Sequence, residues 1–318
     1  MRDVRTAKSN RLAGPRSNFV KLAAAIVILL VLGPVSSFAQ VTPERLLGAS
    51  SQAADLEFPA EPSQLSSSSR ARMALYKPDG PGPFPALVLL HQCGGLGNAR
   101  WQNLSMLEWA REAVARGYVA FLVDSLGPRG VTTVCMGPQR GVNFMRGVKD
   151  ALQAAAQLRR FDFVDGKRIA LAGYSWGAMV GLLASSRLWG TTLGAGERFA
   201  AVVSFYPGCF TIRPPDGEPY EIANTDIDRP LLVLMGGQDT ETPAAECIAK
   251  LETARAAGAP VEWHLYPGST HCWDCENLDG YSKIDVRGNR VVYRYDEAAL
   301  RDAAQRMFGF LATNLAAR

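Results

Sequence analysis

Histidine is scarce in this chain, which holds only three in 318 residues, His91, His264 and His271. A reaction that needs an imidazole base must use one of these three, so each can be judged by its place in the sequence. The chain also lacks internal repeats. This absence argues against a solenoid or a propeller, which are built from repeated units.

A long apolar run is missing as well. The most apolar segment near the start, Leu22 to Leu32, is shorter than the roughly 20 residues that cross a bilayer. Six basic residues precede it and Ser37-Phe38-Ala39 follows it, which is the order of a secretory signal peptide. We therefore expect cleavage after Ala39 and a periplasmic or secreted protein. An uncleaved membrane anchor is the alternative.

The mature chain lacks an excess of charge of either sign. Residues 1–39 carry six basic side chains and one acidic side chain, so without them the formal charge falls from +4 to −1. A near-neutral chain offers no electrostatic basis for binding nucleic acid or an anionic membrane. We expect neither as a partner, and no stable membrane association after cleavage.

The rest of the sequence is long enough for one large domain. Residues 40–69 are rich in Ser, Ala and Pro and predict an irregular leader. Residues 70–318 can bury a substantial core as a single α/β domain.

Short apolar runs alternate with longer amphipathic stretches from residue 70 onward. This alternation predicts a mostly parallel sheet with helices on both faces. The expected strands are Arg70–Tyr76, Ala86–His91, Val119–Asp124, Arg168–Gly173, Ala200–Phe205, Leu231–Met235 and Val261–Tyr266. The expected helices are residues 100–116, 140–159, 177–188, 243–257 and 297–316, and residues 281–296 predict a surface hairpin around Gly288-Asn289.

The segment Gly173-Tyr174-Ser175-Trp176-Gly177 matches the pattern G-x-S-x-G. It directly follows an expected strand and opens an Ala- and Leu-rich helix. A sharp turn between strand and helix exposes the serine hydroxyl above the sheet, and small residues must flank it. The pattern predicts Ser175 as a nucleophile.

A serine hydroxyl needs a base to remove its proton, and His271 is the expected base. His91 comes before the nucleophile, whereas the chain order of this type of site is Ser, acid, His. His264 lies in the middle of an expected strand, from which it cannot easily reach the carboxyl edge of the sheet. His271 lies in the loop that follows that strand.

The acid should follow the strand between the nucleophile and the base. Asp239 meets this condition, and would fix the tautomer of the imidazole and stabilise the imidazolium. Glu241 is the rival, while Asp274, only three residues from His271, is expected to face solvent.

Acyl transfer also requires backbone donors for the negative oxygen that develops in the transition state. We expect one from the N–H of Trp176, which follows the nucleophile. The other should come from the Gly-rich loop after the strand Ala86–His91, from either Gln92 or Cys93.

Seven segments in this order resemble the dienelactone hydrolase family within the α/β-hydrolases. They are HQCGGLG at 91–97, DSLGPRG at 124–130, GYSWG at 173–177, FYPGC at 205–209, GGQDTETP at 236–243, YPGSTHCW at 266–273 and YDEAA at 295–299. The resemblance covers residues from about 70 to the C-terminus. It implies an α/β-hydrolase fold, a monomer, a small ester or lactone substrate and no cofactor. Family members that open dienelactones have Cys in place of Ser175, so we expect a more general carboxylic-ester hydrolase.

Other interpretations compete with this one. A catalytically silent exported binding protein is possible on the same fold, but binding alone would not require Ser175, Asp239 and His271 together. The pattern His271-Cys272-x-x-Cys275 suggests haem or zinc. Haem attachment needs the His last, and zinc needs a further ligand, so we expect no metal. Candidate substrate-binding residues in the edge loops are Arg129, Tyr206 and Trp273, with Arg129 a possible receptor for a substrate carboxylate.

Six cysteines in an exported protein predict disulfides. They permit 15 connectivities, from which we choose the one that links cysteines that the fold brings together, in loops after successive strands or, for Cys272 and Cys275, within one short loop. The expected pairs are Cys93–Cys135, Cys209–Cys247 and Cys272–Cys275. Six buried thiols are the alternative.

Overall fold

The computed structural model describes residues 53–214 and 218–316. The predicted signal peptide and the first part of the predicted leader lie outside these residues. The described part of the leader, residues 53–69, contains no helix or strand, but Asp55 pairs with Arg146 and Phe58 packs edge-on against Phe121. This part of the leader therefore packs against the body of the domain.

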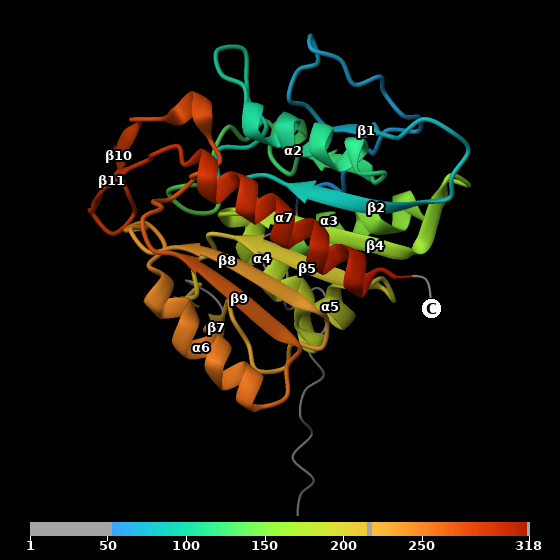
Figure 1. Cartoon of the computed structure of the whole chain (residues 1–318). Coiled ribbons are helices and arrows are strands. Elements are labelled where there is room, and N and C mark those ends of the chain that lie inside the picture. Colours follow the sequence, from blue (N-terminus) through green and yellow to red (C-terminus); the bar gives the residue numbers. More distant parts are fainter. Residues whose placement is uncertain (1–52, 215–217, 317–318) are drawn as a thin grey trace, which may run out of the picture. The chain divides into compact units, whose positions relative to one another are not determined.

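The described residues form a central sheet of seven strands in the order β1-β3-β2-β4-β5-β8-β9 (Figure 1). Only β1 runs antiparallel to its neighbour, and the other pairings are parallel. The strands are β1 Ala74–Tyr76, β2 Phe84–Leu90, β3 Val119–Val123, β4 Val164–Tyr174, β5 Ala201–Phe205, β8 Leu231–Gly236 and β9 Val261–Tyr266. All seven predicted strands are confirmed, with ends that differ by a few residues.

Helices cover both faces of the sheet, as predicted. The helices are α2 Leu104–Ala115, α3 Phe144–Leu158, α4 Trp176–Ser185, α5 Arg187–Gly194, α6 Ala244–Ala256 and α7 Glu297–Asn314. Alternate side chains of β2 face opposite cores: Val88 and Leu90 pack with α3 to α6, whereas Leu87 and Leu89 pack with α2 and α7. Strands buried on both faces explain the continuous apolar runs in the sequence.

The separate helix α5 was not predicted. The sequence prediction ran one helix through residue 188, but the backbone is extended at Ser186 (ψ 139°), which ends α4. The Ser186 side chain then accepts a hydrogen bond from the N–H of Trp189 and caps α5.

Two short antiparallel pairs lie outside the main sheet. The pair β10 (Ser282–Ile284) and β11 (Arg290–Val292) confirms the predicted surface hairpin. The pair β6 (Thr211–Ile212) and β7 (Tyr220–Glu221) was not predicted, since two-residue strands leave no periodic signal. No helix among the described residues is both long and apolar enough to span a bilayer.

Candidate active site

Ser175 occupies a strained turn between β4 and α4. Its φ of 52° and ψ of −109° are unusual for a residue with a side chain. A Cβ on Gly173 would lie 2.0 Å from the carbonyl oxygen of Gly177, and a Cβ on Gly177 would lie 2.2 Å from that of Leu90. The turn can therefore form only with glycine at both flanking positions, as the sequence pattern requires.

The structure brings Ser175, His271 and Asp239 together. The Nε2 atom of His271 lies 2.9 Å from Oγ of Ser175, and its Nδ1 atom lies 2.7 Å from Oδ2 of Asp239. The three residues come from the loops after β4, β8 and β9, which end at the same edge of the parallel sheet. All three are buried, with Ser175 only 4% exposed.

The Asp239 carboxylate is held by its own loop. Its Oδ1 accepts hydrogen bonds from the backbone N–H groups of Glu241 and Thr242, at 2.9 and 2.8 Å. The Thr242 hydroxyl donates to Oδ2 at 2.7 Å. The sequence analysis missed Thr242, although an Asp followed three residues later by Thr is a recognisable turn pattern.

The charge state of His271 depends on two opposing effects. Burial alone would lower the pKa of His271, but the charges of Asp239 and Glu241 outweigh burial, and the pKa lies above the usual 6.5. Lys283 acts in the opposite direction from Glu241. The raised pKa makes the imidazole a stronger base toward the hydroxyl of Ser175, which lies 2.9 Å from Nε2.

Glu241, the rival for the role of acid, occupies the other edge of the ring. Its Oε2 lies 3.8 Å from Nε2 of His271, whereas Asp239 is hydrogen-bonded to Nδ1. The structure therefore separates the two carboxylates of this loop, with Asp239 at the position of a triad acid. His264 lies in β9 as expected, 4.0 Å from Asp302 and away from Ser175 in the sheet.

The predicted oxyanion loop lies directly against the Ser175 turn. The N–H of Gly177 donates to the carbonyl of His91 at 3.1 Å. Within the described residues, the N–H groups of Gln92, Cys93 and Trp176 donate to no protein acceptor. Gln92 and Cys93 both remain candidates for the second donor.

His91 is fully buried behind this loop. One ring nitrogen, Nδ1, lies 2.7 Å from the carbonyl oxygen of Gln92, while Nε2 accepts from the N–H of Ser125 at 3.1 Å. Its ring also stacks on Trp176. Burial lowers the pKa of His91, which is consistent with a neutral structural role rather than that of a base.

Tyr206 and Asp274 form a buried network. Asp274 is only 5% exposed, which corrects the prediction that it faces solvent. The Tyr206 hydroxyl donates to Oδ1 of Asp274 at 2.8 Å and accepts from Nε2 of Gln92 at 3.1 Å. Trp109 donates to Oδ2 of Asp274 at 2.8 Å. Long-range contacts between loops enclose these groups, so sequence proximity to His271 said nothing about their exposure.

The two other residues predicted to bind substrate, Trp273 and Arg129, also lie inside the protein. Trp273 is fully buried, with the rings of Tyr206 and Tyr266 against it. Arg129 forms a two-point ion pair with the buried Asp150 and also donates to the carbonyl of Ala54. Its guanidinium is thus engaged by partners within the protein.

All three expected disulfides are present. The bridges are Cys93–Cys135, Cys209–Cys247 and Cys272–Cys275, and no free cysteine remains among the described residues. The first bridge holds the oxyanion loop, and the third lies next to His271. Cys272, Asp274 and Cys275 lie close enough to share a metal ion, but the sulfur atoms of both cysteines are bonded to each other.

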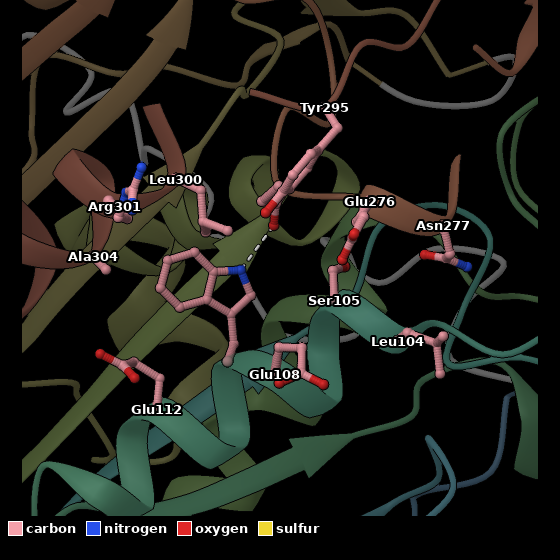
Figure 2. A pocket seen from close by; sticks show the side chains of 12 residues that line it. Leu104, Ser105, Glu108, Glu112, Glu276, Asn277, Tyr295, Leu300, Arg301 and Ala304 are labelled. Atoms are coloured by element: carbon pink, nitrogen blue, oxygen red, sulfur yellow. Dashed lines mark hydrogen bonds between the residues drawn. The ribbon is translucent and has the colours of Figure 1, made fainter. Parts of the chain in front are cut away.

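A cavity of about 590 Å³ opens on the α2 and α7 face (Figure 2). Leu104, Ser105 and Glu108 of α2 line one side, and Arg301 and Ala304 of α7 line another. Neither Ser175 nor His271 lines it. The cavity is therefore separate from the three assembled residues.

The comparisons with known proteins cover most of the chain. A sequence model of the dienelactone hydrolase family matches residues 71–315. A protein of Salmonella typhimurium named "Putative carboxymethylenebutenolidase" is 28% identical over 151 residues, which are 46% of this chain and 47% of that protein. The chain thus spans about half the length of this curated relative.

Solved structures share the fold at low sequence identity. The Thermogutta terrifontis esterase Est2 has a TM-score of 0.55 and 16% identity, over 76% of this chain and 88% of that one. The alpha/beta hydrolase enzyme MGS-M1, from a deep-sea metagenome library, has a TM-score of 0.51 and 19% identity, over 73% and 85%. The fold is that of the α/β-hydrolases, and with the family match over nearly the whole described domain, the chain belongs to the dienelactone hydrolase family.

Proposed function

We propose that the protein is an exported serine hydrolase that cleaves carboxylic esters or lactones through an acyl-Ser175 intermediate. One observation carries the proposal: a single imidazole, that of His271, contacts the Ser175 hydroxyl with one nitrogen and the Asp239 carboxylate with the other. This is the arrangement by which a serine hydroxyl becomes a nucleophile. Membership of a family of ester and lactone hydrolases supports the same reaction class.

In the acylation step, Nε2 of His271 takes the proton of the Ser175 hydroxyl as Oγ attacks the carbonyl carbon. The imidazolium that forms is stabilised by Asp239 at 2.7 Å. The developing oxyanion is received by the N–H of Trp176 together with that of Gln92 or Cys93. Each such donor is worth about 3–4 kcal/mol of transition-state stabilisation.

Collapse of the tetrahedral intermediate breaks the bond between the carbonyl carbon and the alkoxy oxygen. His271 gives its proton to the departing oxygen, which leaves as the alcohol and leaves the acyl group on Ser175. Water then attacks the acyl carbon while His271 removes its proton. The bond between that carbon and Oγ of Ser175 breaks, His271 returns the proton to Oγ, and the carboxylic acid is released. In a lactone the leaving oxygen stays tethered, so the product is a single hydroxy acid.

These steps use only side chains and backbone donors of the chain. We therefore expect a small-molecule substrate and no cofactor, and EDTA should leave the rate of ester hydrolysis unchanged. Inhibition by EDTA that is reversed by added zinc would contradict this expectation.

A fluorophosphonate that forms a stable adduct tests the nucleophile directly. Mass spectrometry should locate one adduct on Ser175 in the wild-type protein and none in Ser175→Ala. Hydrolysis of 4-nitrophenyl esters should be lost in parallel. A folded wild-type protein that forms no adduct and hydrolyses no ester would instead indicate a binding protein on the same fold.

Export is supported by the basic, apolar and small-residue order of residues 1–39 and by three disulfides among the described residues. Amino-terminal sequencing of the protein isolated from the periplasm or the medium should give Gln40 as the first residue. Recovery of the full-length chain in the membrane fraction would indicate an uncleaved anchor.

A further inference from the structure

Two carboxylates from one loop flank the His271 ring on opposite edges. Asp239 is hydrogen-bonded to Nδ1, and Oε2 of Glu241 lies 3.8 Å from Nε2. The second distance is longer than a hydrogen bond but short for two groups that can both be charged. The Nε2 edge is also the edge that contacts Ser175, at 2.9 Å. Glu241 thus places a negative charge beside the reacting atoms.

The hairpin of β10 and β11 holds this carboxylate in place. Nζ of Lys283 donates to Oε1 of Glu241 at 2.7 Å, and the hydroxyl of Tyr293 donates to Oε2 at 3.0 Å. The Glu241 side chain is only 15% exposed. Its field is therefore screened less by salt and water than that of a surface carboxylate.

Negative groups outnumber positive ones around the ring. Asp239 and Glu241 lie against it, and Asp274 follows it in the same loop. The rings of Tyr206 and Tyr293, which are neutral, also contact it. Lys283 is already paired with Glu241. Arg129, the predicted receptor for a substrate carboxylate, is paired with Asp150.

The leaving group must approach the same edge. In the proposed reaction Nε2 gives its proton to the departing oxygen, so that oxygen lies about 3 Å from Nε2. Substituents on the alcohol then lie within a few ångströms of Glu241. A negatively charged substituent there would lie close to the Glu241 carboxylate with little water between them, so the two charges would repel each other.

We propose that Glu241 determines specificity on the leaving-group side, so that the enzyme hydrolyses esters of neutral or cationic alcohols and discriminates against anionic ones. This inference rests on the proposed ester hydrolysis at Ser175. It concerns the charge of the alcohol portion of the ester substrate.

Three butyrate esters of similar shape test the proposal. Their alcohols are choline, 3,3-dimethylbutanol and 4-hydroxy-2,2-dimethylbutanoate, which are cationic, neutral and anionic. At low salt, kcat/KM for the anionic ester should be at least tenfold below that for the neutral ester, and the cationic ester should equal or exceed the neutral one. Raising the salt concentration should reduce the differences in kcat/KM among the three esters, because salt screens the charges.

Variants assign the effect to one carboxylate. Glu241→Gln should bring the neutral-to-anionic ratio of kcat/KM to within about threefold of unity. Glu246→Gln is the matched control, because Glu246 also pairs with the hairpin, through Arg287, and should keep the wild-type ratio. Lys283→Met removes the cation that is paired with Glu241, and should increase the neutral-to-anionic ratio of kcat/KM. This second variant tests the proposal even if Glu241→Gln does not fold.

The outcomes separate this inference from the proposed function. Equal hydrolysis of all three esters by the wild type, or unchanged selectivity in Glu241→Gln, would overturn the role of Glu241 while ester hydrolysis stands. Unchanged or weaker discrimination in Lys283→Met would overturn it too. If no ester is hydrolysed and Ser175 forms no fluorophosphonate adduct, the proposed function fails and this inference fails with it.

Discussion

The guanidinium of Arg129 donates hydrogen bonds to both carboxylate oxygens of Asp150, at 2.7 Å to Oδ2 and 2.8 Å to Oδ1. The two side chains are 6% and 0% exposed, and burial raises the pKa of Asp150. A planar guanidinium that binds a carboxylate at two points forms one of the stronger ion pairs in proteins. Its partner is internal, so we expect Arg129 to stabilise the fold rather than to bind a substrate.

Arg129→Met should therefore lower the free energy of unfolding by about 3–5 kcal/mol, because it leaves the Asp150 charge buried and unpaired. Arg306→Met removes a more exposed pair, with Asp302, and should cost less than about 1 kcal/mol. Urea denaturation measures both. A stable Arg129→Met protein that had lost activity only toward anionic esters would restore the substrate-binding interpretation.

Ser175→Ala and His271→Ala should each lower kcat by several orders of magnitude. The double variant should be little worse, since the two residues act as a unit in the proposed reaction. His264→Ala, which alters a side chain that is 34% exposed, should keep most of the activity. Steady-state hydrolysis of a 4-nitrophenyl ester measures all four, and loss of turnover in His264→Ala but not in His271→Ala would reverse the assignment.

The pH profile should report the raised pKa of His271. The base must be neutral to accept the Ser175 proton, so kcat/KM should rise with pH through one ionisation, with its midpoint above the usual 6.5. Glu241→Gln should lower this midpoint, because it removes a charge that favours the imidazolium. Lys283→Met should raise it. A wild-type midpoint below 6.5 would show that burial outweighs the carboxylates.

Gly177→Ala should abolish activity and destabilise the protein. The added Cβ would lie 2.2 Å from the carbonyl oxygen of Leu90 and 2.7 Å from that of His91, both backbone atoms that cannot easily move. Gly309→Ala is the matched control in α7, where nothing lies within 4 Å of the added carbon, and it should stabilise the helix by about 0.5–1 kcal/mol. Activity and thermal unfolding of both variants test this contrast, and a fully active Gly177→Ala protein would contradict it.

The disulfides should make unequal contributions to stability. The Cys209–Cys247 bridge spans 38 residues of sequence and should contribute about 4 kcal/mol by the chain-entropy model. The Cys272–Cys275 bridge spans three and should contribute about half as much. Replacing each pair by serine and measuring urea denaturation tests the difference. Six alkylated cysteines in the unreduced native protein would refute the bridges altogether.

Several features of the fold and the site could be predicted from the sequence because their causes are local. The strand, the glycine-flanked turn and the helix around Ser175 are adjacent in the chain, and steric contact within the turn imposes the two glycines. With only three histidines, chain order excluded His91 and the mid-strand position excluded His264, which left His271. The Cys93–Cys135 and Cys209–Cys247 pairs could also be predicted, since segments that follow neighbouring parallel strands meet at one edge of the sheet. Cys272 and Cys275 are close in the chain itself.

Tertiary structure decided the features that depend on packing between distant segments. Arg129 meets Asp150 from α3, Tyr206 meets Asp274 across the edge loops, and Glu241 is oriented by the β10–β11 hairpin. A loop residue has no periodicity that shows whether its side chain faces solvent or the interior. The sequence by itself determined which residues could carry the chemistry. Only the three-dimensional contacts decided which charges are paired inside the protein and which carboxylates lie beside His271, because burial and pairing depend on neighbours far away in the chain.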